Sequence, residues 1–424
     1  MSKGKVVVGM SGGVDSSVAA WLLKEQGYDV IGVTMQIWQD EPELIQEENG
    51  GCCGLSAVDD ARRVAQILDI PYYVMNFKKE FKANVMDYFV DEYLHGRTPN
   101  PCIACNRYVK WESLLQRSLA IGADYIATGH YARIEQLPNG RYAIRNSVTA
   151  AKDQTYALYN LTQEQLKRTL MPVGEYSKDQ IRVMAEKIGL PTAHKKDSQE
   201  ICFVDDNDYA GFIDGYGQGK VPEGNFVDKD GKVLGRHKGI TRYTIGQRKG
   251  LNIALGKPVF VQKICPETNE VVLGSNEDLF TTTVRANRLN FMAVEDIPEE
   301  IGALGKIRYN HRGDTCKVKR IGEDLLECHF DTPVRAVTPG QAVVLYDGEY
   351  VLGGGTILMI RCDAHMHTRF SEDSDASVHS MLDAAIERGM EAVCITDHLD
   401  KDFPQTPDFP AGAFLFDLGN YFRG

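Results

Sequence analysis

The chain has 424 residues, of which 43% are hydrophobic and 25% charged, and its 59 acidic and 47 basic residues give a formal net charge of -12. This composition is typical of a soluble globular protein with roughly two to four domains. Ten cysteines are too few for a disulfide-stapled secreted scaffold, and no window approaches the roughly 18 apolar residues of a membrane span. We therefore expect a cytoplasmic monomer without membrane contact. Taken alone, the acidic total also argues against a nucleic-acid partner.

The first half of the chain alternates strand-like and helix-like patterns. Apolar, often β-branched runs predict strands at 5–10, 29–35, 72–76 and 124–128. Amphipathic stretches between them predict helices at 14–26, 56–69, 78–95 and 106–121. Alternation of this kind requires right-handed crossovers and a parallel sheet. We therefore expect an α/β, Rossmann-like domain with a parallel sheet over residues 1–215.

The pattern changes after residue 215. Short alternating runs, separated by Gly, Asn and Asp, predict strands at 259–264, 271–273, 317–321 and 342–346. We expect two small β-rich modules here, a central one at 216–280 and a C-terminal β-barrel at 281–357. A new strand-like run at 359–363 opens a partial α/β tail over residues 358–424.

The loop after the first predicted strand has the composition of a phosphate-binding loop. It reads Ser11-Gly12-Gly13-Val14-Asp15-Ser16-Ser17. Its glycines allow close backbone approach, the following helix N-terminus attracts anions, and Asp15 is suited to hold Mg²⁺ against phosphates. The Walker and dinucleotide spacings are absent. The residues instead resemble the SGGxDS loop of the PP-loop pyrophosphatases, which implies ATP binding.

Three cysteines lie near basic residues or near the expected start of a helix. Cys102 and Cys105 form a Cys-x-x-Cys pair shortly before Arg107, and Cys202 follows a pair of lysines. A helix dipole and nearby cations stabilise a thiolate, so Cys105 is a candidate nucleophile. The spacing by itself is also compatible with half of a zinc site, a redox pair or two buried side chains.

These motifs, with five further ones, follow an order that resembles the bacterial tRNA-specific 2-thiouridylases. The resemblance covers residues 1 to about 357 and rests on the segments 11–17, 98–106, 128–133, 152–156, 197–203, 244–250, 308–309 and 339–341. It implies ATP-dependent 2-thiolation of the wobble uridine of tRNA. In that reaction ATP adenylates the C2 oxygen, and AMP leaves when sulfur attacks the carbon.

The resemblance also implies roles for individual residues. Cys202 carries a persulfide supplied by a cysteine desulfurase or sulfur-relay protein, and Cys105 is the nucleophile that frees the sulfur, through a transient disulfide between the two. Asp15 belongs to the catalytic set. The ATP site comprises Gly9, Met10, Ser11, Gly12, Gly13, Val14, Asp15, Ser16, Met35 and Gly129. The target base and the tRNA contact Asn100, Pro101, Cys102, His130, Lys152, Asp153, Gln154, Arg308, Tyr309 and Gln341.

One position departs from part of that family. Cys102 stands where some members have an Asp with an acid/base role, so such a role is in doubt here. Cys102, Cys105 and Cys202 are also a ligand set for a [4Fe-4S] cluster with one open iron. The persulfide mechanism and the cluster mechanism are therefore equally weighted alternatives at this point.

A basic segment lies within the acidic chain. Between Gly231 and Pro266 there are eight Lys and Arg and not one Asp or Glu, a pattern that suits phosphate-backbone contact better than a merely solvated surface. Residues 306–320 form a weaker basic group. Residues 358–424 hold 12 acidic against 5 basic residues, more than half of the net negative charge. The charge total therefore does not exclude tRNA.

The tail has chemistry of its own. His365, His367 and His398 follow two strand-like runs and resemble the first metal motifs of the PHP phosphoesterases, especially the histidinol-phosphatase type. Only the first part of such a domain is present, so we expect an incomplete appendage, with a three-His metal site as the alternative. For the main chain, the alternatives to thiolation are an amidotransferase-type PP-loop ligase and a nonenzymatic tRNA-binding protein.

Overall fold

A computed structural model describes residues 2–37, 55–195, 201–204, 208–216, 221–358, 361–369, 374–387, 390–395 and 397. The chain divides into two compact units, Met1–Ile357 and Leu358–Gly424. Among the described residues, no helix is both long and apolar enough to cross a bilayer.

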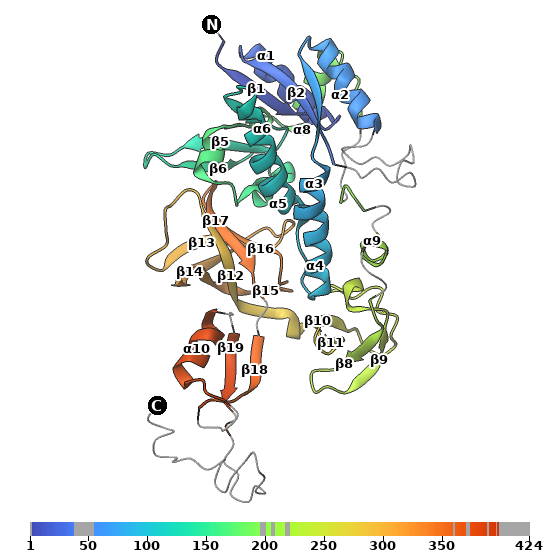
Figure 1. Ribbon diagram of the computed structural model, residues 1–424, viewed down its shortest axis with the longest axis vertical. Coiled ribbons are helices and arrows are strands. Elements are labelled where there is room, and N and C mark those ends of the chain that lie inside the picture. The colour runs from blue at the N-terminus through green and yellow to red at the C-terminus, as the bar shows by residue number, and fades with distance from the viewer. Residues whose placement is uncertain are drawn as a thin grey trace, which may run out of the picture. The chain divides into compact units, whose positions relative to one another are not determined.

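The first unit begins with a five-stranded parallel sheet (Figure 1). Its order is β3-β2-β1-β4-β7, built from β1 (Lys5–Gly9), β2 (Asp29–Gln36), β3 (Tyr72–Asn76), β4 (Tyr125–Ala127) and β7 (Thr169–Leu170). Val6, Val7 and Val8 of the central strand are fully buried. A parallel sheet covered on both faces needs such continuous apolar runs, which is why the sequence predicts β1 to β4. The two-residue β7 was not predicted.

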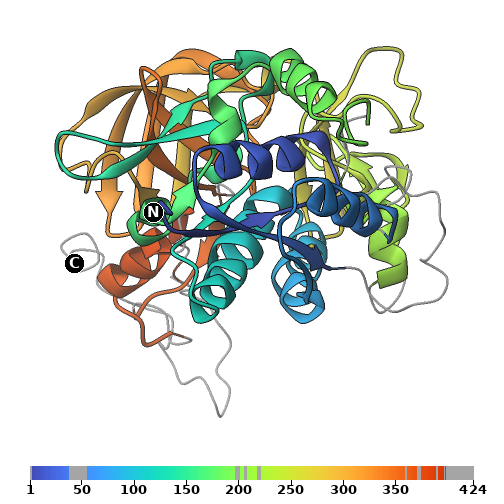
Figure 2. The ribbon, with the colours of Figure 1, turned by 90° about the horizontal axis from the view of Figure 1, so that it is seen from above.

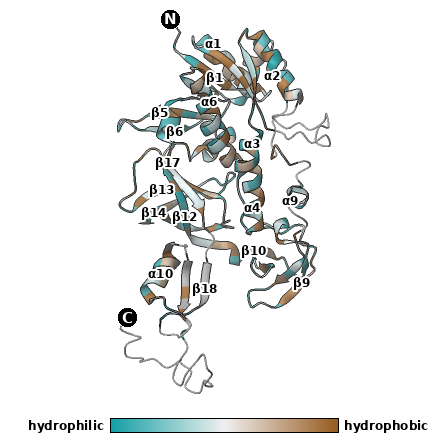
Figure 3. Cartoon of the chain, in the orientation of Figure 1, coloured by the Kyte–Doolittle hydropathy of each residue, from teal (hydrophilic) through white to brown (hydrophobic). Residues whose placement is uncertain are grey.

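Helices cover both faces of the sheet (Figure 2). Val6 and Val8 pack with α1 (Val14–Glu25), α2 (Leu55–Ile67) and α8 (Lys178–Lys187). Val7, on the opposite face, packs with two long helical segments. The first consists of α3 (Lys78–Phe81), a π-helical stretch (Lys82–Asp87) and α4 (Tyr88–Leu94). The second consists of α5 (Pro101–Ala104), a π-helical stretch (Cys105–Leu114) and α6 (Leu115–Ala120). Figure 3 shows hydrophilic and hydrophobic residues side by side along α2 and α4, as amphipathic helices require.

The second long helix begins earlier than the sequence predicts. The expected start was residue 106, but Pro101 is its first residue. Asn100 caps this end, since its Oδ1 accepts hydrogen bonds from the N–H groups of Cys102 (3.1 Å) and Ile103 (3.3 Å). Proline is favourable at the first helical position, where its missing N–H costs nothing. Cys102 therefore lies in the first turn, and Cys105 opens the second.

Short elements connect the sheet with the β modules. They are the hairpin β5 (Ala132–Gln136) and β6 (Tyr142–Asn146), the 3-10 turns Ala150–Lys152, Thr155–Leu158 and Pro172–Glu175, and helices α7 (Gln163–Lys167) and α9 (Tyr209–Tyr216). A four-stranded sheet follows, in the order β10-β11-β8-β9. Its strands are β8 (Gly224–Val227), β9 (Val233–His237), β10 (Phe260–Cys265) and β11 (Glu270–Gly274), and the 3-10 turns Ile240–Arg242 and Glu277–Leu279 flank them.

The last part of the first unit is a closed six-stranded barrel. It consists of β12 (Phe280–Phe291), β13 (Ile301–Lys306), β14 (Asp314–Gly322), β15 (Leu325–Arg335), β16 (Ala342–Asp347) and β17 (Tyr350–Ile357). It closes because β12 pairs with both β15 and β17. β17 also pairs with β6, through Tyr350 and Arg145, so the early hairpin extends the barrel sheet.

The described residues of the second unit form one βαβ element. Strands β18 (Arg361–Met366) and β19 (Met390–Ile395) are parallel, and α10 (Val378–Glu387) lies between them in the chain. Of the strand expected at 359–363, residues 359–360 lie outside the described residues. The predicted fold class, a Rossmann-like domain followed by two β-rich modules and a partial α/β tail, is confirmed.

Candidate active site

The predicted nucleotide loop lies at the point where the sheet changes direction. The chain runs from β1 outward to β2 and β3, and then returns to add β4 on the other side of β1. Ligands of doubly wound sheets bind in the crevice at the carboxyl ends of the strands beside such a point. Ser11–Ser16 follow β1 and Gly129 follows β4, so the structure brings these predicted residues together.

The glycines of this site are needed for close packing. At Gly12, with φ +68°, a Cβ would lie 2.3 Å from the Ala57 carbonyl oxygen. At Gly129 a Cβ would lie 2.6 Å from the backbone nitrogen of Ser16. Gly13 differs, because among the described residues a Cβ there would meet only the Ser11 hydroxyl, at 3.5 Å. A Cβ would therefore be tolerated at Gly13, whereas Gly12 and Gly129 are tightly packed.

Gly13 is also the N-cap of α1, and no side chain caps this helix end. The Ser16 hydroxyl donates to the Gly13 carbonyl at 3.1 Å and accepts from the Ser11 N–H at 3.2 Å. An open helix N-terminus with hydroxyl groups beside it is a site for phosphate. The residues present therefore fit the triphosphate of ATP.

The remaining predicted ATP residues belong to β1, β2 and α1 or directly follow β1. Met10 is buried, and its carbonyl accepts a hydrogen bond from the Thr34 hydroxyl at 2.7 Å. Met35, the next residue of β2, is half-buried against the core of the opposite face. Gly9 ends β1, and Val14 begins α1 with its side chain buried. These residues contribute packing beside the loop.

Asp15 has two partners that the sequence did not indicate. The Lys178 ammonium lies 2.8 Å from each of its carboxylate oxygens, and the Tyr131 hydroxyl donates to Oδ1 at 2.6 Å. Lys178 begins α8 after the capping residue Ser177, and its side chain is only 11% exposed. Tyr131 lies inside a motif that the sequence singled out, whereas Lys178 belongs to none. Positive charge therefore already lies beside the carboxylate expected to hold Mg²⁺.

The cysteine helix presents its two thiols differently. Cys102 is exposed, while Cys105 is half-buried and packs against the core that includes Trp111 and Leu114. Pro101 is buried and Asn100 serves as the cap, so two residues predicted to contact the target base act here on the start of the helix. This end of the helix consequently has one exposed and one partly shielded sulfur.

Cys202 lies in a short described segment, 201–204, and is exposed. The next residue, Phe203, packs edge-on against Phe81 (5.6 Å between ring centroids) and Phe89 (5.3 Å). Cys105 and Phe203 both pack against the same core cluster. The aromatic contacts therefore bring the Cys202 segment to the face of the domain that carries the cysteine helix. Most of the motif around Cys202 lies outside the described residues.

The three cysteines are not arranged as a cluster site. Among the residues that the structure describes, which include Cys102, Cys105 and Cys202, no group of three or more His, Cys, Asp or Glu side chains is placed to hold a metal ion. These residues as placed do not fit a [4Fe-4S] cluster.

Two of the predicted tRNA contacts, Asp153 and Gln154, form hydrogen bonds within the protein. The Asp153 carboxylate accepts hydrogen bonds from the N–H groups of Ser147 (2.9 Å) and Thr155 (3.1 Å). Gln154 Oε1 accepts from the Tyr131 N–H at 2.9 Å, and the Gln154 N–H donates to the Tyr131 carbonyl at 3.0 Å. Lys152 ends the turn before them and is half-exposed. Asp153 and Gln154 thus stabilise the loop. Gln154 also joins it to Tyr131, whose hydroxyl donates to Asp15.

His130 is held in its neutral form. Burial, together with the nearby Lys110 ammonium, holds the pKa of its imidazole well below the usual value. Its Nδ1 is 2.7 Å from the Thr128 hydroxyl, and its ring lies 5.5 Å from that of Trp111. An RNA contact at His130 would therefore be a hydrogen bond, not an ion pair.

Two of the three predicted barrel residues, Tyr309 and Gln341, form hydrogen bonds with loops of the first domain, whereas Arg308 is bonded within the barrel. The Tyr309 hydroxyl donates to the Asp153 carbonyl at 3.1 Å, and the pKa of Tyr309 is raised by burial and by the nearby Asp153 and Cys102. Arg308 Nη1 donates to the Arg335 carbonyl at 2.8 Å. Gln341 Nε2 donates to the Thr98 carbonyl at 2.8 Å. Residues far apart in the sequence thus meet around Cys102.

Most of the basic segment is exposed. Lys232, Arg236, Lys238, Arg248, Lys249, Lys257 and Lys263 are all exposed, while Arg242 forms a part-buried salt bridge with Asp214. In the weaker basic group, Lys317 pairs with Glu300 (3.4 Å) and Arg320 with Asp296 (2.5 Å). The exposed segment is therefore the stronger candidate for phosphate contact.

The tail histidines are only partly described. His365 lies on β18, His367 follows it and is half-buried, and His398 lies outside the described residues. Asp397 is engaged with Thr368, whose N–H and hydroxyl donate to its two carboxylate oxygens at 2.5 and 2.6 Å. Within the described part of this unit, no metal-binding group is present.

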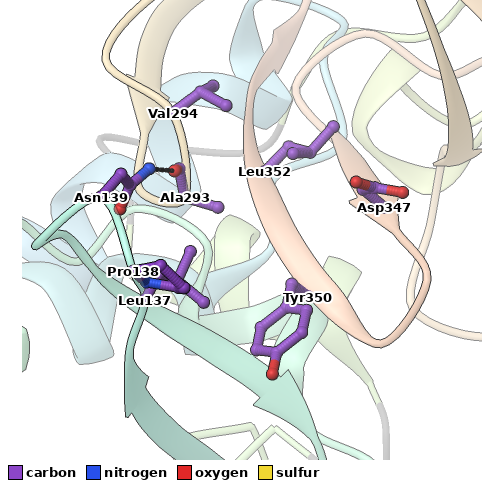
Figure 4. A pocket seen from close by; sticks show the side chains of 8 residues that line it. All are labelled: Leu137, Pro138, Asn139, Ala293, Val294, Asp347, Tyr350 and Leu352. Carbon is purple, nitrogen blue, oxygen red and sulfur yellow. Dashed lines mark hydrogen bonds between the residues drawn. The ribbon is translucent and has the colours of Figure 1, made fainter.

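A separate hollow lies between the β5–β6 hairpin and the barrel (Figure 4). It has a volume of about 370 Å³ and is lined by Leu137, Pro138, Asn139, Ala293, Val294, Asp347, Tyr350 and Leu352. The Asn139 side chain donates to the Ala293 carbonyl at 3.0 Å across it. It contains none of the predicted site residues, and its hydrogen bond joins the hairpin to the barrel.

Four family models match the chain in succession. They are a tRNA methyl transferase HUP domain (residues 4–206), a tRNA methyl transferase PRC-barrel domain (210–275), an aminomethyltransferase beta-barrel domain (281–357) and a PHP domain (363–422). Similar curated proteins are tRNA-specific 2-thiouridylases named MnmA. That of Lachnoclostridium phytofermentans is 71% identical over 84% of this chain and 99% of its own length. Those of Clostridium perfringens (58% over 84% and 99%) and Clostridioides difficile (55% over 83% and 98%) follow.

Proposed function

The chain belongs to the tRNA-specific 2-thiouridylase family, and from that premise we propose that it thiolates the wobble uridine by ATP-dependent adenylation followed by persulfide sulfur transfer. The enzyme is a sulfurtransferase acting on tRNA. Two of the matched domain models are described as methyl transferase domains. The similar curated proteins are 2-thiouridylases, so thiolation is the activity that we propose. The observation that carries the proposal is the combination of an open phosphate loop with two cysteines on one face of the same domain.

In the first step the loop binds the phosphates of ATP. The N–H groups at the start of α1 and the hydroxyls of Ser11 and Ser16 hold the pyrophosphate portion, with the open space at Gly13 admitting it. The C2 oxygen of the uridine attacks the α-phosphorus and pyrophosphate leaves. Mg²⁺, held by Asp15 together with phosphate oxygens, would neutralise charge there, since Mg²⁺ commonly uses only one or two carboxylates. Lys178 supplies a cation at the same place.

In the second step sulfur replaces the adenylated oxygen. A cysteine desulfurase or relay protein loads Cys202 as a persulfide, whose terminal sulfur attacks C2 while AMP leaves. The Cys105 thiolate then attacks Sγ of Cys202, which breaks the persulfide S–S bond, forms a Cys105–Cys202 disulfide and leaves the sulfur on the base. A dithiol reductant restores both thiols. The exposure of Cys202 suits loading by a partner protein, and the partial burial of Cys105 suits a resolving nucleophile.

Binding of the tRNA is assigned to the exposed basic segment 231–266. Its lysines and arginines contact the phosphate backbone, while the flipped base reaches the region around Cys102 and Tyr309. The affinity for tRNA should therefore fall as the salt concentration rises, because each neutralised phosphate releases counterions.

Replacement of the cysteines tests the proposal. We expect Cys105→Ser and Cys202→Ser to abolish 2-thiouridine formation, measured by mass spectrometry of digested tRNA, with unchanged tRNA affinity. Cys328→Ser is the matched control, because this buried thiol lies in β15, outside both the cysteine helix and the basic segment, and its loss should leave activity intact. Normal thiolation by either active-site variant would refute the mechanism. Anaerobic purification with iron and sulfide analysis separates it from the cluster alternative, since iron-free protein that thiolates needs no cluster.

A further inference from the structure

A histidine ring closes the loop between β13 and β14, residues 307–313, which we call the β13–β14 loop. Nδ1 of His311 accepts a hydrogen bond from the Ile307 N–H at 3.3 Å, and Nε2 lies 3.0 Å from Oδ2 of Asp314. The His311 N–H also donates to the carbonyl of Arg308 at 3.0 Å. The imidazole therefore joins the first residue of the loop to the first residue of β14.

The two residues that the ring joins are themselves fixed by the barrel. Ile307 is 1% exposed and belongs to the barrel core. Asp314 is paired with Gly305 of β13 in the antiparallel ladder. The side chain of His311 is only 13% exposed. The ring thus spans two rigid points, and the backbone between them carries the residues that face outward.

Only one form of the ring satisfies both contacts. A neutral imidazole has one donor and one acceptor nitrogen. Nδ1 must be the acceptor because the Ile307 N–H donates to it, and Nε2 must carry the proton because the Asp314 carboxylate accepts. Burial, together with the nearby Arg308 and Lys306, holds the pKa of the imidazole below its usual value, although Asp314 opposes this shift. A second proton, on Nδ1, would face the Ile307 N–H and break that hydrogen bond.

The β13–β14 loop presents Arg308 and Tyr309, two of the predicted tRNA contacts. The Tyr309 hydroxyl donates to the Asp153 carbonyl at 3.1 Å, yet the side chain is 43% exposed and accessible to RNA. The Arg308 guanidinium donates to the Arg335 carbonyl at 2.8 Å. Both residues come just before His311, at two and three positions along the chain. Opening of the loop at the ring would therefore release both side chains from these positions.

We infer that His311 is a positioning residue for Arg308 and Tyr309, because as a neutral ring it closes the β13–β14 loop and holds both side chains where the tRNA contacts them. It acts through the backbone, since the N–H that it binds belongs to Ile307, the residue before Arg308. The inference rests on the proposed function, in which the tRNA reaches the region around Tyr309. It assigns a role to a residue outside every motif that the sequence singled out.

Two substitutions of His311 separate the effects of its two nitrogens. His311→Asn places an amide oxygen near the position of Nδ1 and keeps an acceptor for the Ile307 N–H, whereas His311→Gln reaches toward Asp314 and loses that acceptor. His329→Gln is the matched control, because this exposed histidine lies on β15, outside the loop.

The two variants should differ in loop order and in tRNA affinity. We expect His311→Gln to increase amide hydrogen exchange in peptide 306–313 about tenfold and to weaken the Kd for tRNA about tenfold, as the loss of one RNA contact does. His311→Asn and the control should stay within about twofold of the parent in both measurements. Parent-like exchange and affinity in His311→Gln would overturn the inference.

A double-mutant cycle shows whether His311 acts through the two loop residues. In a protein that already carries Arg308→Ala and Tyr309→Ala, nothing remains to be positioned. Adding His311→Gln to that protein should therefore change the Kd for tRNA by less than about twofold. A further tenfold loss there would contradict the inference, because His311 would then contribute to binding on its own.

The pH dependence of exchange tests the inference in the parent, whether or not His311→Gln folds. Protonation removes the acceptor for the Ile307 N–H, so the protection factor of peptide 306–313 should fall as the pH drops below the usual histidine pKa of about 6.5. His311→Asn does not titrate there, and its protection factor should stay constant. The same pH dependence in both proteins would show that another group controls the loop. If the parent fails to bind tRNA, the proposed function fails, while the exchange measurements still decide whether His311 closes the loop.

Discussion

Two glycines of the nucleotide loop should respond differently to the same added methyl group. At Gly129 an alanine Cβ would lie 2.6 Å from Ser16 N and 2.7 Å from Asp15 C, about 0.8 Å short of ordinary contact. Both obstacles are backbone atoms of α1, which cannot rotate away. Overpacking of this kind costs about 1–3 kcal/mol, so Gly129→Ala should lower the melting temperature by roughly 2–10 °C.

At Gly13 the added methyl group meets open space. This residue has φ -100° and ψ 162°, an extended conformation that alanine adopts readily, and the nearest obstacle to a Cβ is 3.5 Å away. Gly13→Ala should therefore keep the melting temperature of the parent. Its methyl group occupies the space that we assign to phosphate, so the affinity for ATP should fall at least tenfold, or about 1.4 kcal/mol.

Scanning fluorimetry without nucleotide and calorimetric titration with ATP separate the two effects. Gly302→Ala in β13 is the control, because nothing lies within 4 Å of a Cβ at that position and it is outside the nucleotide site. We expect reduced stability and reduced ATP affinity for Gly129→Ala, reduced affinity alone for Gly13→Ala, and neither for Gly302→Ala. Parent-like ATP binding by Gly13→Ala would refute the assignment of the phosphate position.

Three further predictions concern charged and titratable groups. Arg97→Ala should destabilise the protein by about 3–5 kcal/mol in urea unfolding, because it leaves the buried Glu92 carboxylate unpaired. Lys317→Ala removes an exposed ion pair and should change the stability by less than about 1 kcal/mol. Equal losses of stability in the two variants would contradict the burial argument. Because the folded state keeps His130 neutral while the unfolded imidazole ionises below about pH 6.5, stability should decline as pH falls through 6.5, and His130→Asn should show a shallower decline in melting temperature. Lys178→Met should weaken ATP binding most strongly without Mg²⁺, as measured by calorimetry; an unchanged affinity would show that Lys178 only neutralises Asp15.

The parallel sheet and the phosphate loop could be predicted because their signals are local. β1 and β2 are apolar runs that are largely buried, and β3 is an apolar run at the edge of the sheet whose residues are partly or fully exposed. The predicted bounds of all three agree with the structure to within about one residue. The glycines of the loop likewise indicate close backbone packing within a few residues of the sequence motif. The start of the cysteine helix was wrong by five residues because Pro101 occupies the one helical turn in which proline is tolerated.

Long-range partners could not be predicted in this way. Lys178 meets Asp15 across 163 positions, and a single lysine after an ordinary capping serine gives no local sign of its partner. The hairpin at Ala132–Asn146 pairs with a strand more than 200 residues later, so it joins a sheet of the barrel although it lies within the first expected domain. The hydrogen bond from the Gln341 side chain to the Thr98 carbonyl likewise joins segments 243 positions apart, so no local pattern predicts it.

Barrel closure by β17 has a consequence for the order in which the enzyme matures. N-terminal segments of a chain generally fold first during synthesis, and the strands of the parallel sheet are all complete by Leu170. Thr98, however, is hydrogen-bonded to the Pro339 carbonyl and to the Gln341 side chain, which are synthesised much later. Ile357, in the closing strand, is in turn hydrogen-bonded to Gly340 and Gln341. The helix that carries Cys105 should therefore reach its final position late, after the nucleotide loop has formed. A shortened chain that ends before the barrel is expected to bind nucleotide but to hold the helix of Cys105 loosely. The α/β domain and the barrel should therefore be kept together in engineered variants.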